Sequence, residues 1–196
     1  MNQQINSEKY LKEDFNKALE TLRAGNIILF PTDLEWAYGC DATNTAAVDK
    51  LFEVGNGLLN TKTTLLIDQP GKLQSFLHEV PEMAWDLIEL SDQPLTIYFS
   101  GIKNLATQLM GENKQTGFRI TADKFSMDLC LRFRNPILTL APVSERRKSY
   151  KSFSEISEKL KELADYVVEY GQNKSITEKK HAQILLEKGN KFKLLD

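Results

Sequence analysis

Apolar residues recur along this chain at two spacings, one typical of helices and one of short buried strands. Leu11, Phe15, Ala18, Leu19 and Leu22 follow helical spacing, and Gly25 after them predicts the end of the helix. The same spacing predicts further helices over residues 45–54, 73–78, 81–90, 122–133 and 156–163. Short apolar runs bounded by turn residues predict strands over residues 26–30, 63–67, 94–99, 117–121, 136–140, 166–168, 182–186 and 192–195.

Local sequence signals set the expected ends of several elements. Thr45 is placed to cap the second helix, and Pro81 lies where a first helical turn accepts proline. Residues 152–155 read Ser-Phe-Ser-Glu, which is the capping-box pattern ahead of a late helix. Residues 189–190, Gly-Asn, are expected to join the last two strands as a hairpin.

The alternation of helices and strands predicts an α/β fold with an open, twisted mixed sheet. The sequence shows no internal repeat and no long low-complexity linker, so residues 1–196 are interpreted as a single domain. With 41% hydrophobic and 27% charged residues, a chain of 196 residues is long enough to build a substantial core.

The composition also indicates where in the cell the protein is expected. No run of about 18 apolar residues is present, so no membrane span is expected. The first twelve residues are polar and do not resemble a signal peptide. Cys40 and Cys130 lie far apart in sequence and do not form a disulfide framework, which favours a reduced, cytoplasmic setting.

Charge is distributed unevenly along the chain. Residues 1–130 hold 11 Lys and Arg against 18 Asp and Glu, whereas residues 131–196 hold 14 against 9. The basic excess is concentrated at Arg132, Arg134, Arg146, Arg147, Lys148 and Lys151. Such a group either attracts a phosphate-bearing partner through its local potential or is simply a solvated loop, and the sequence leaves both interpretations open.

Several common chemistries find no support in the sequence. His78 and His181 are the two histidines, neither has a cysteine or carboxylate at metal-ligand spacing, and both are expected at the surface, so no metal site is predicted. Phosphate-loop, dinucleotide-binding and nucleophile-elbow glycine motifs are missing. Zinc enzymes, serine hydrolases and the ordinary nucleotide-binding folds are therefore disfavoured.

The strand over residues 26–30 runs directly into Pro31, Thr32 and Asp33. A hydroxyl and a carboxylate at the end of a buried strand occupy the position where open α/β sheets bind ligands. The alternative is a turn in which Thr32 and Asp33 bond only to their own backbone.

The wider surroundings of this segment resemble a known family. Residues 31–33 read Pro-Thr-Asp, Trp36 follows, and residues 39–44 read Gly-Cys-Asp-Ala-Thr-Asn, which is similar to the opening motif of the YrdC family. Further similar segments follow in order, over about residues 20–195: residues 48–54, 60–62, 94–96, 117–119, 135–137 and 166–168. The resemblance implies an open α/β sheet with flanking helices around a central cavity.

The resemblance also implies an activity. Catalytic members of the family are L-threonylcarbamoyladenylate synthases, which join L-threonine, bicarbonate and ATP, usually with Mg²⁺, and release pyrophosphate. Their product serves the threonylcarbamoyl modification of tRNA, and double-stranded RNA binding is attributed to the fold. Carried over residue by residue, the substrate- and nucleotide-binding positions are Thr32, Asp33, Lys62, Thr96, Arg119 and Thr139.

This chain departs from the family pattern at the positions that serve the chemistry. Gly55, Asn56 and Gly57 stand where catalytic relatives carry a Lys-x-Arg pair, and Ala141 and Val143 stand where relatives carry Ser-x-Asn. Glu35 places a carboxylate where the family prefers an apolar residue, and would repel ATP if it pointed inward. Losing one preorganised charge-stabilising contact typically costs about 10²–10³ in rate. No catalytic residue is therefore assigned, and weak or lost synthase activity is expected.

Three hypotheses remain. The chain is a synthase relative with weak or lost catalysis, or a binding module that holds tRNA, duplex RNA or another anion through its basic C-terminal third. For the synthase, Arg146, Arg147 and Lys148 either reach a phosphate in place of the missing cations or form an exposed loop. For the binding module, the same three residues are the candidate anion- or RNA-binding residues. A small-molecule sensor that uses Thr32, Asp33 and Thr96 is the third.

Overall fold

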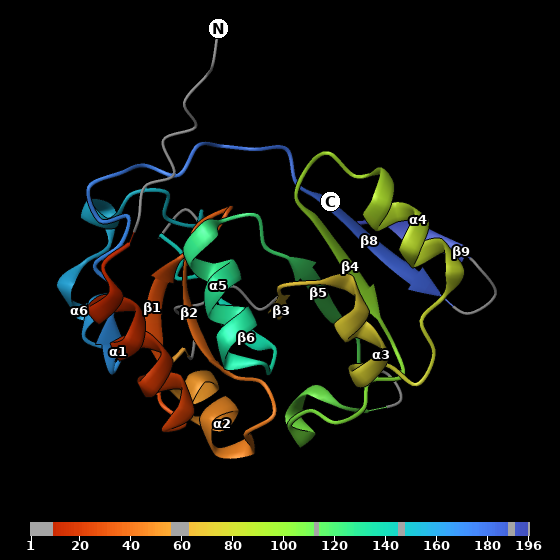
Figure 1. Cartoon of the computed structure of the whole chain (residues 1–196), viewed down its shortest axis with the longest axis horizontal. Coiled ribbons are helices and arrows are strands. Elements are labelled where there is room, and N and C mark those ends of the chain that lie inside the picture. The colour runs from red at the N-terminus through yellow and green to blue at the C-terminus, as the bar shows by residue number, and fades with distance from the viewer. Residues whose placement is uncertain (1–9, 56–62, 112–113, 145–147, 188–190, 196) are drawn as a thin grey trace, which may run out of the picture.

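The computed structural model describes residues 10–55, 63–111, 114–144, 148–187 and 191–195 (Figure 1). Its strands are β1 (Ile28–Pro31), β2 (Trp36–Asp41), β3 (Thr64–Ile67), β4 (Leu95–Phe99), β5 (Thr116–Ile120), β6 (Ile137–Leu140), β7 (Tyr166–Val167), β8 (Ala182–Glu187) and β9 (Lys191–Leu194). Its α-helices are α1 (Lys12–Arg23), α2 (Thr45–Val54), α3 (Leu73–Phe76), α4 (Glu82–Leu90), α5 (Lys124–Phe133) and α6 (Glu158–Lys161). Short 3₁₀ helices cover Pro70–Lys72, Thr107–Leu109 and Phe153–Glu155.

Within the described residues, the strands form one nine-stranded open sheet in the order β7-β1-β2-β6-β3-β5-β4-β8-β9. The pairs β1–β7, β3–β5 and β4–β8 are parallel and the other pairs are antiparallel. The predicted open mixed sheet with flanking helices is confirmed, as is the antiparallel pairing of the last two strands. Residues 189–190, which were expected to join these two strands, lie outside the described residues.

Helices cover both faces of this sheet. On one face α1 and α5 lie over the central strands, where Phe15, Leu22 and Phe125 pack against Ile28 and Phe30 of β1 (Figure 1). On the opposite face α2, α3 and α4 pack on the alternate side chains of the same strands. Successive strand residues therefore serve different layers, as the two-residue period of a strand requires.

A buried carboxylate joins the first helix to the segment that contains and follows β7. Asp14 of α1 is 2% exposed and accepts hydrogen bonds from the Tyr166 hydroxyl at 2.7 Å and from the backbone N–H groups of Glu169 and Tyr170, both at 2.9 Å. These contacts fix α1 beside β7, which is itself paired with β1.

Several element ends differ from the sequence prediction. β2 was not predicted, because its six residues are almost all buried and show no alternation of polar and apolar positions. Asn44, not Thr45, caps α2, accepting from the Ala47 N–H at 3.2 Å. The capping box at Ser152 and Glu155 is present, but it begins a 3₁₀ helix.

Helix lengths also differ in places. α3 ends at Phe76 and not at residue 78, and α5 begins at Lys124 and not at residue 122. α6 covers only Glu158–Lys161 of the predicted 156–163. The first helix ends as predicted, with Gly25 at a positive φ of 75° that few other residues adopt.

Both cysteines are buried free thiols. Burial raises the pKa of the Cys40 thiol and of the Cys130 thiol. Among the described residues, every helix is too short or too polar to cross a bilayer.

Candidate functional site

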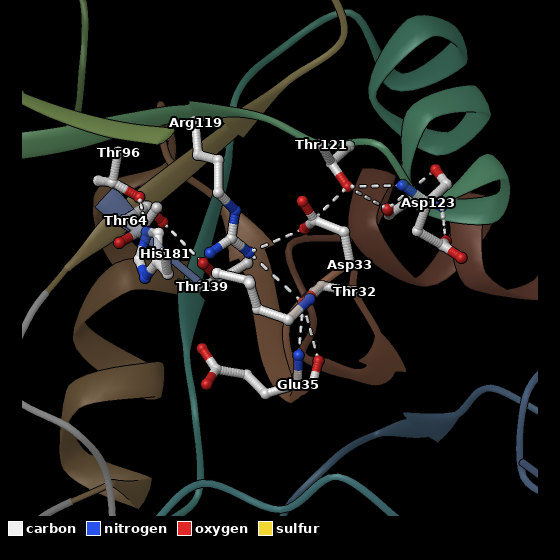
Figure 2. Close-up of polar contacts among 12 residues, drawn as sticks. Thr32, Asp33, Glu35, Thr64, Thr96, Arg119, Thr121, Asp123, Thr139 and His181 are labelled. Atoms are coloured by element: carbon white, nitrogen blue, oxygen red, sulfur yellow. Dashed lines mark hydrogen bonds and ion pairs between the residues drawn. The ribbon is translucent and has the colours of Figure 1, made fainter. Parts of the chain in front are cut away.

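The tip of the β1–β2 hairpin, Thr32 to Glu35, forms one side of the candidate site. The Thr32 hydroxyl donates to the Glu35 carbonyl at 2.8 Å and accepts from the N–H groups of Leu34 at 3.2 Å and Glu35 at 3.1 Å. This side chain therefore closes the turn on its own backbone. The interpretation that Thr32 and Asp33 bond only to their own backbone is nevertheless wrong, because both also contact Arg119. Figure 2 shows the Asp33 carboxylate directed toward Arg119 and Thr121, whereas the Glu35 side chain extends away from Asp33, below the Arg119 guanidinium.

Asp33 and Arg119 form a buried ion pair. The Asp33 side chain is 1% exposed and the Arg119 side chain 4%, and Oδ1 lies 3.3 Å from Nη2. Oδ1 also accepts from the Thr121 hydroxyl at 3.3 Å, and Nη2 donates to the Thr32 hydroxyl at 3.4 Å. In the described part of the chain, Asp33 Oδ2 and Arg119 Nε have no hydrogen-bond partner. Buried unpaired polar atoms are uncommon and often mark functional sites.

A small hollow, hereafter the polar pocket, lies on the Arg119 side of the sheet. It has a volume of about 130 Å³ and is lined by Glu35, Thr64, Tyr98, Arg119, Thr139, Ala141, His181 and Gln183. Strand register explains the grouping: Thr96 pairs with Arg119, and Thr64 pairs with Thr139. Side chains at alternate positions then point to one face.

The polar side chains around this pocket form hydrogen bonds with neighbouring side chains or backbone. The Thr96 hydroxyl lies 2.8 Å from His181 Nε2, and the Tyr98 hydroxyl donates to Gln183 Oε1 at 3.2 Å. The Thr139 hydroxyl donates to the Thr64 carbonyl at 2.9 Å. These bonds hold the lining in fixed orientations.

The expectation that both histidines lie at the surface is wrong for His181. His78 is exposed, but His181 is half-buried and lines the polar pocket. The cause is the parallel pairing of β4 with β8, which brings the start of β8 beside Thr96. That pairing joins segments too distant for a sequence pattern to reveal.

Two opposite charges face this pocket. Figure 2 shows the Arg119 guanidinium between the Asp33 carboxylate and the group formed by Thr64, Thr139 and His181, with the Glu35 side chain below. Burial is the main cause of the raised pKa of the Tyr98 phenol; Arg119 opposes the shift and Glu35 adds to it. Both charges thus act on the same small volume, and Glu35 does point inward.

The basic residues of the C-terminal third are not all placed. Lys62, Arg146 and Arg147 lie outside the described residues. Lys148 is exposed, whereas Lys151 is half-buried and donates to the Leu34 carbonyl at 2.6 Å, which anchors the hairpin tip. RNA or anion binding through this region stays a prediction.

Sequence reasoning brought together Thr32, Asp33, Thr96, Arg119 and Thr139, and the structure places all five around the hairpin tip and the polar pocket. It missed the contributions of Tyr98 and Gln183. Tyr98 follows Thr96 by two residues, so strand periodicity could have found it.

Comparison with known proteins gives the family. The sequence profile Sua5_yciO_yrdC, described as "Telomere recombination", matches residues 20–189. The chain belongs to this family. The YrdC resemblance inferred from the motifs is therefore confirmed.

Named relatives of this YrdC-family chain are distant. An uncharacterized protein of Haemophilus influenzae is 26% identical over 161 residues, which is 80% of this chain and 77% of that protein. A threonylcarbamoyl-AMP synthase of Coxiella burnetii is 23% identical over 128 residues, which is 65% of this chain and 69% of that protein.

Solved structures share the fold. E. coli YciO matches with a TM-score of 0.79 at 20% identity, over 96% of this chain and 90% of that one. P. abyssi Sua5 complexed with L-threonine matches with a TM-score of 0.80 at 20% identity, over 96% of this chain. The chain spans only 55% of that Sua5 structure.

Proposed function

We propose that this protein is a relative of threonylcarbamoyl-AMP synthase whose synthase activity is weak or lost and whose polar pocket still binds a small amino acid of the L-threonine type. Family membership and the named synthase relatives support the kinship. The L-threonine complex of P. abyssi Sua5, which has the same fold, supports the ligand class.

The observation that carries this proposal is the presence of Glu35 and Arg119 in one pocket of about 130 Å³. A free amino acid has an ammonium group and a carboxylate, so it complements a carboxylate and a guanidinium placed together. The hydroxyl groups of Thr64 and Thr139 add neutral polar surface suited to a hydroxylated side chain.

The same charges oppose a nucleotide triphosphate. Arg119 is the one permanent cation among the described residues that line the pocket, so it suits a single carboxylate but cannot neutralise the charge of a triphosphate. Glu35 repels a polyanion at short range. Ala141 lines the pocket at a position where the family pattern has a polar residue, so no side-chain hydrogen bond can be made there.

ATP and Mg²⁺ remain expectations that apply only if synthase activity is retained. Among the described residues no group of three or more histidine, cysteine or acidic side chains is arranged to hold a metal ion. We therefore derive no step through Mg²⁺. The chemistry left to this chain's own residues is to orient a bound amino acid between Glu35 and Arg119.

Calorimetric titration with L-threonine and with ATP, together with pyrophosphate release in the presence of bicarbonate, tests the proposal. Glu35→Gln removes the charge with little change of shape, and Glu20→Gln on the exposed face of α1 is the matched control. A hydrogen bond to a charged group contributes about 1.5–3 kcal/mol, so Glu35→Gln should weaken L-threonine binding by at least about tenfold.

The outcomes separate the two parts of the proposal. L-threonine binding that Glu35→Gln weakens and Glu20→Gln leaves unchanged supports the pocket assignment. Failure of the wild-type protein to bind L-threonine would overturn that assignment. Sustained pyrophosphate release by the wild type would overturn the loss of synthase activity.

A further inference from the structure

A second and larger cavity lies on the opposite face of the sheet. Its volume is about 420 Å³, and its walls include Ile97 and Phe99 of β4, Phe118 and Ile120 of β5 and Ile88 of α4. Phe118 and Ile120 flank Arg119 in sequence, so their side chains point away from the polar pocket. The two hollows share no lining residue within the described chain.

The polar residues of this cavity gather at one end. β4 runs antiparallel to β5 with Thr96 opposite Arg119, so the loop before β4, which supplies Ser91, Asp92 and Gln93, lies beside the end of β5. β8 is parallel to β4 with Ala182 opposite Leu95, which brings Lys179 to the same end. The cavity is thus apolar in its depth and polar at one end.

Asp33 lines that polar end. Its Oδ1 atom accepts from Arg119 and Thr121, whereas its Oδ2 atom is buried and accepts no hydrogen bond from the described residues. A buried carboxylate oxygen without a donor is costly, so a ligand that brings a donor would be favoured there.

We propose that this cavity is a binding site for a small, mostly apolar molecule that carries one hydroxyl or amine donor, which hydrogen-bonds to Asp33 Oδ2. A volume of about 420 Å³ with an apolar lining and a few convergent polar groups is the usual form of a small-molecule site. Protein interiors otherwise leave few voids larger than a water molecule. Among the described residues, Asp33 and Asp92 line the polar end against one cation, Lys179, so the net charge of the lining is negative and disfavours anionic ligands.

Isoleucine side chains in the cavity wall can report ligand binding. Ile67, Ile88, Ile97 and Ile120 line it, whereas Ile28 lies in the core on the other face of the sheet. Methyl-labelled isoleucine therefore allows binding to be located by NMR. The test ligands are p-cresol, which has a donor, 4-methylanisole, which has the same shape without a donor, and p-toluate, which is an anion.

The expected result is a saturable shift of the four cavity methyl signals with p-cresol, while Ile28 stays unchanged. Affinity for 4-methylanisole should be lower by about tenfold or more, because it cannot donate to Asp33, and p-toluate should not bind. Ile88→Trp should fill the cavity and abolish the shifts, and Leu90→Trp, at an 82% exposed position on the same helix, should preserve them.

Two results would overturn the proposal: no saturable shift of the cavity methyl signals up to the solubility limit of p-cresol, or equal affinity for p-cresol and 4-methylanisole. The comparison of the two ligands uses the wild-type protein, so it decides the matter even if Ile88→Trp does not fold. Neither result depends on L-threonine binding in the polar pocket.

Discussion

Replacing Arg119 by methionine should strongly destabilise the fold, because it leaves the Asp33 carboxylate buried without its cation. Both side chains of this pair are at least 96% buried, and Oδ1 would keep only the Thr121 hydroxyl as a partner. Removing one member of a buried ion pair typically costs about 3–5 kcal/mol. For a chain of this size, about 2–4 °C per kcal/mol predicts a fall in Tm of roughly 6–20 °C.

Urea unfolding followed by tryptophan fluorescence, supported by calorimetry, measures this effect. Lys50→Met is the matched control, because its partner Asp165 is 36% exposed and Lys50 itself is 40% exposed. An exposed ion pair contributes at most about 1 kcal/mol, so the control should unfold at nearly the wild-type urea concentration.

A double variant provides the sharper comparison. Asp33→Leu combined with Arg119→Met removes both charges, so it should be more stable than Arg119→Met alone. An Arg119→Met variant that loses less than about 1 kcal/mol, or a double variant less stable than the single one, would refute the view that the buried charge of Asp33 dominates the energetics here.

Three further predictions concern other parts of the molecule. Hydrogen bonds from a lysine and a backbone N–H outweigh burial and hold the pKa of Asp165 below its usual range, so its charge stabilises the fold above about pH 4. Asp165→Asn should lower Tm at pH 7, and the difference should vanish as pH falls through the lowered pKa. Gly117→Ala should cost about 1–3 kcal/mol in urea unfolding, because its Cβ would lie 2.7 Å from Thr96 Cγ2. Cys40 and Cys130, buried with raised thiol pKa values, should react with a thiol reagent such as DTNB only after denaturation.

Sequence patterns predicted most of the secondary structure because the local signals were strong. The spacing of Phe15, Leu19 and Leu22 in α1, and the apolar runs of β3 and β6, are visible in windows of a few residues. β2 was not predicted because a strand buried on both faces shows no alternation of polar and apolar residues.

The candidate site could be predicted only in its parts. Thr32 and Asp33 were found from a strand end, and Arg119 from a family motif, but nothing local indicates that Asp33 and Arg119 form an ion pair. The role of His181 depends on β4 pairing with β8. Such long-range pairings are set by the packing of the whole sheet, so short patterns do not contain them.

The pairing of β1 with β7 has a consequence for how the chain is made. The N–H group of Ile27, immediately before β1, donates to Asp165, 138 residues later, and all four residues of β1 are buried. On a ribosome, the outer edge of this apolar strand would stay open for most of translation, a state prone to aggregation. Chains cut short before Tyr166 should therefore precipitate, and nascent chains should depend on a chaperone until the C-terminal third has emerged.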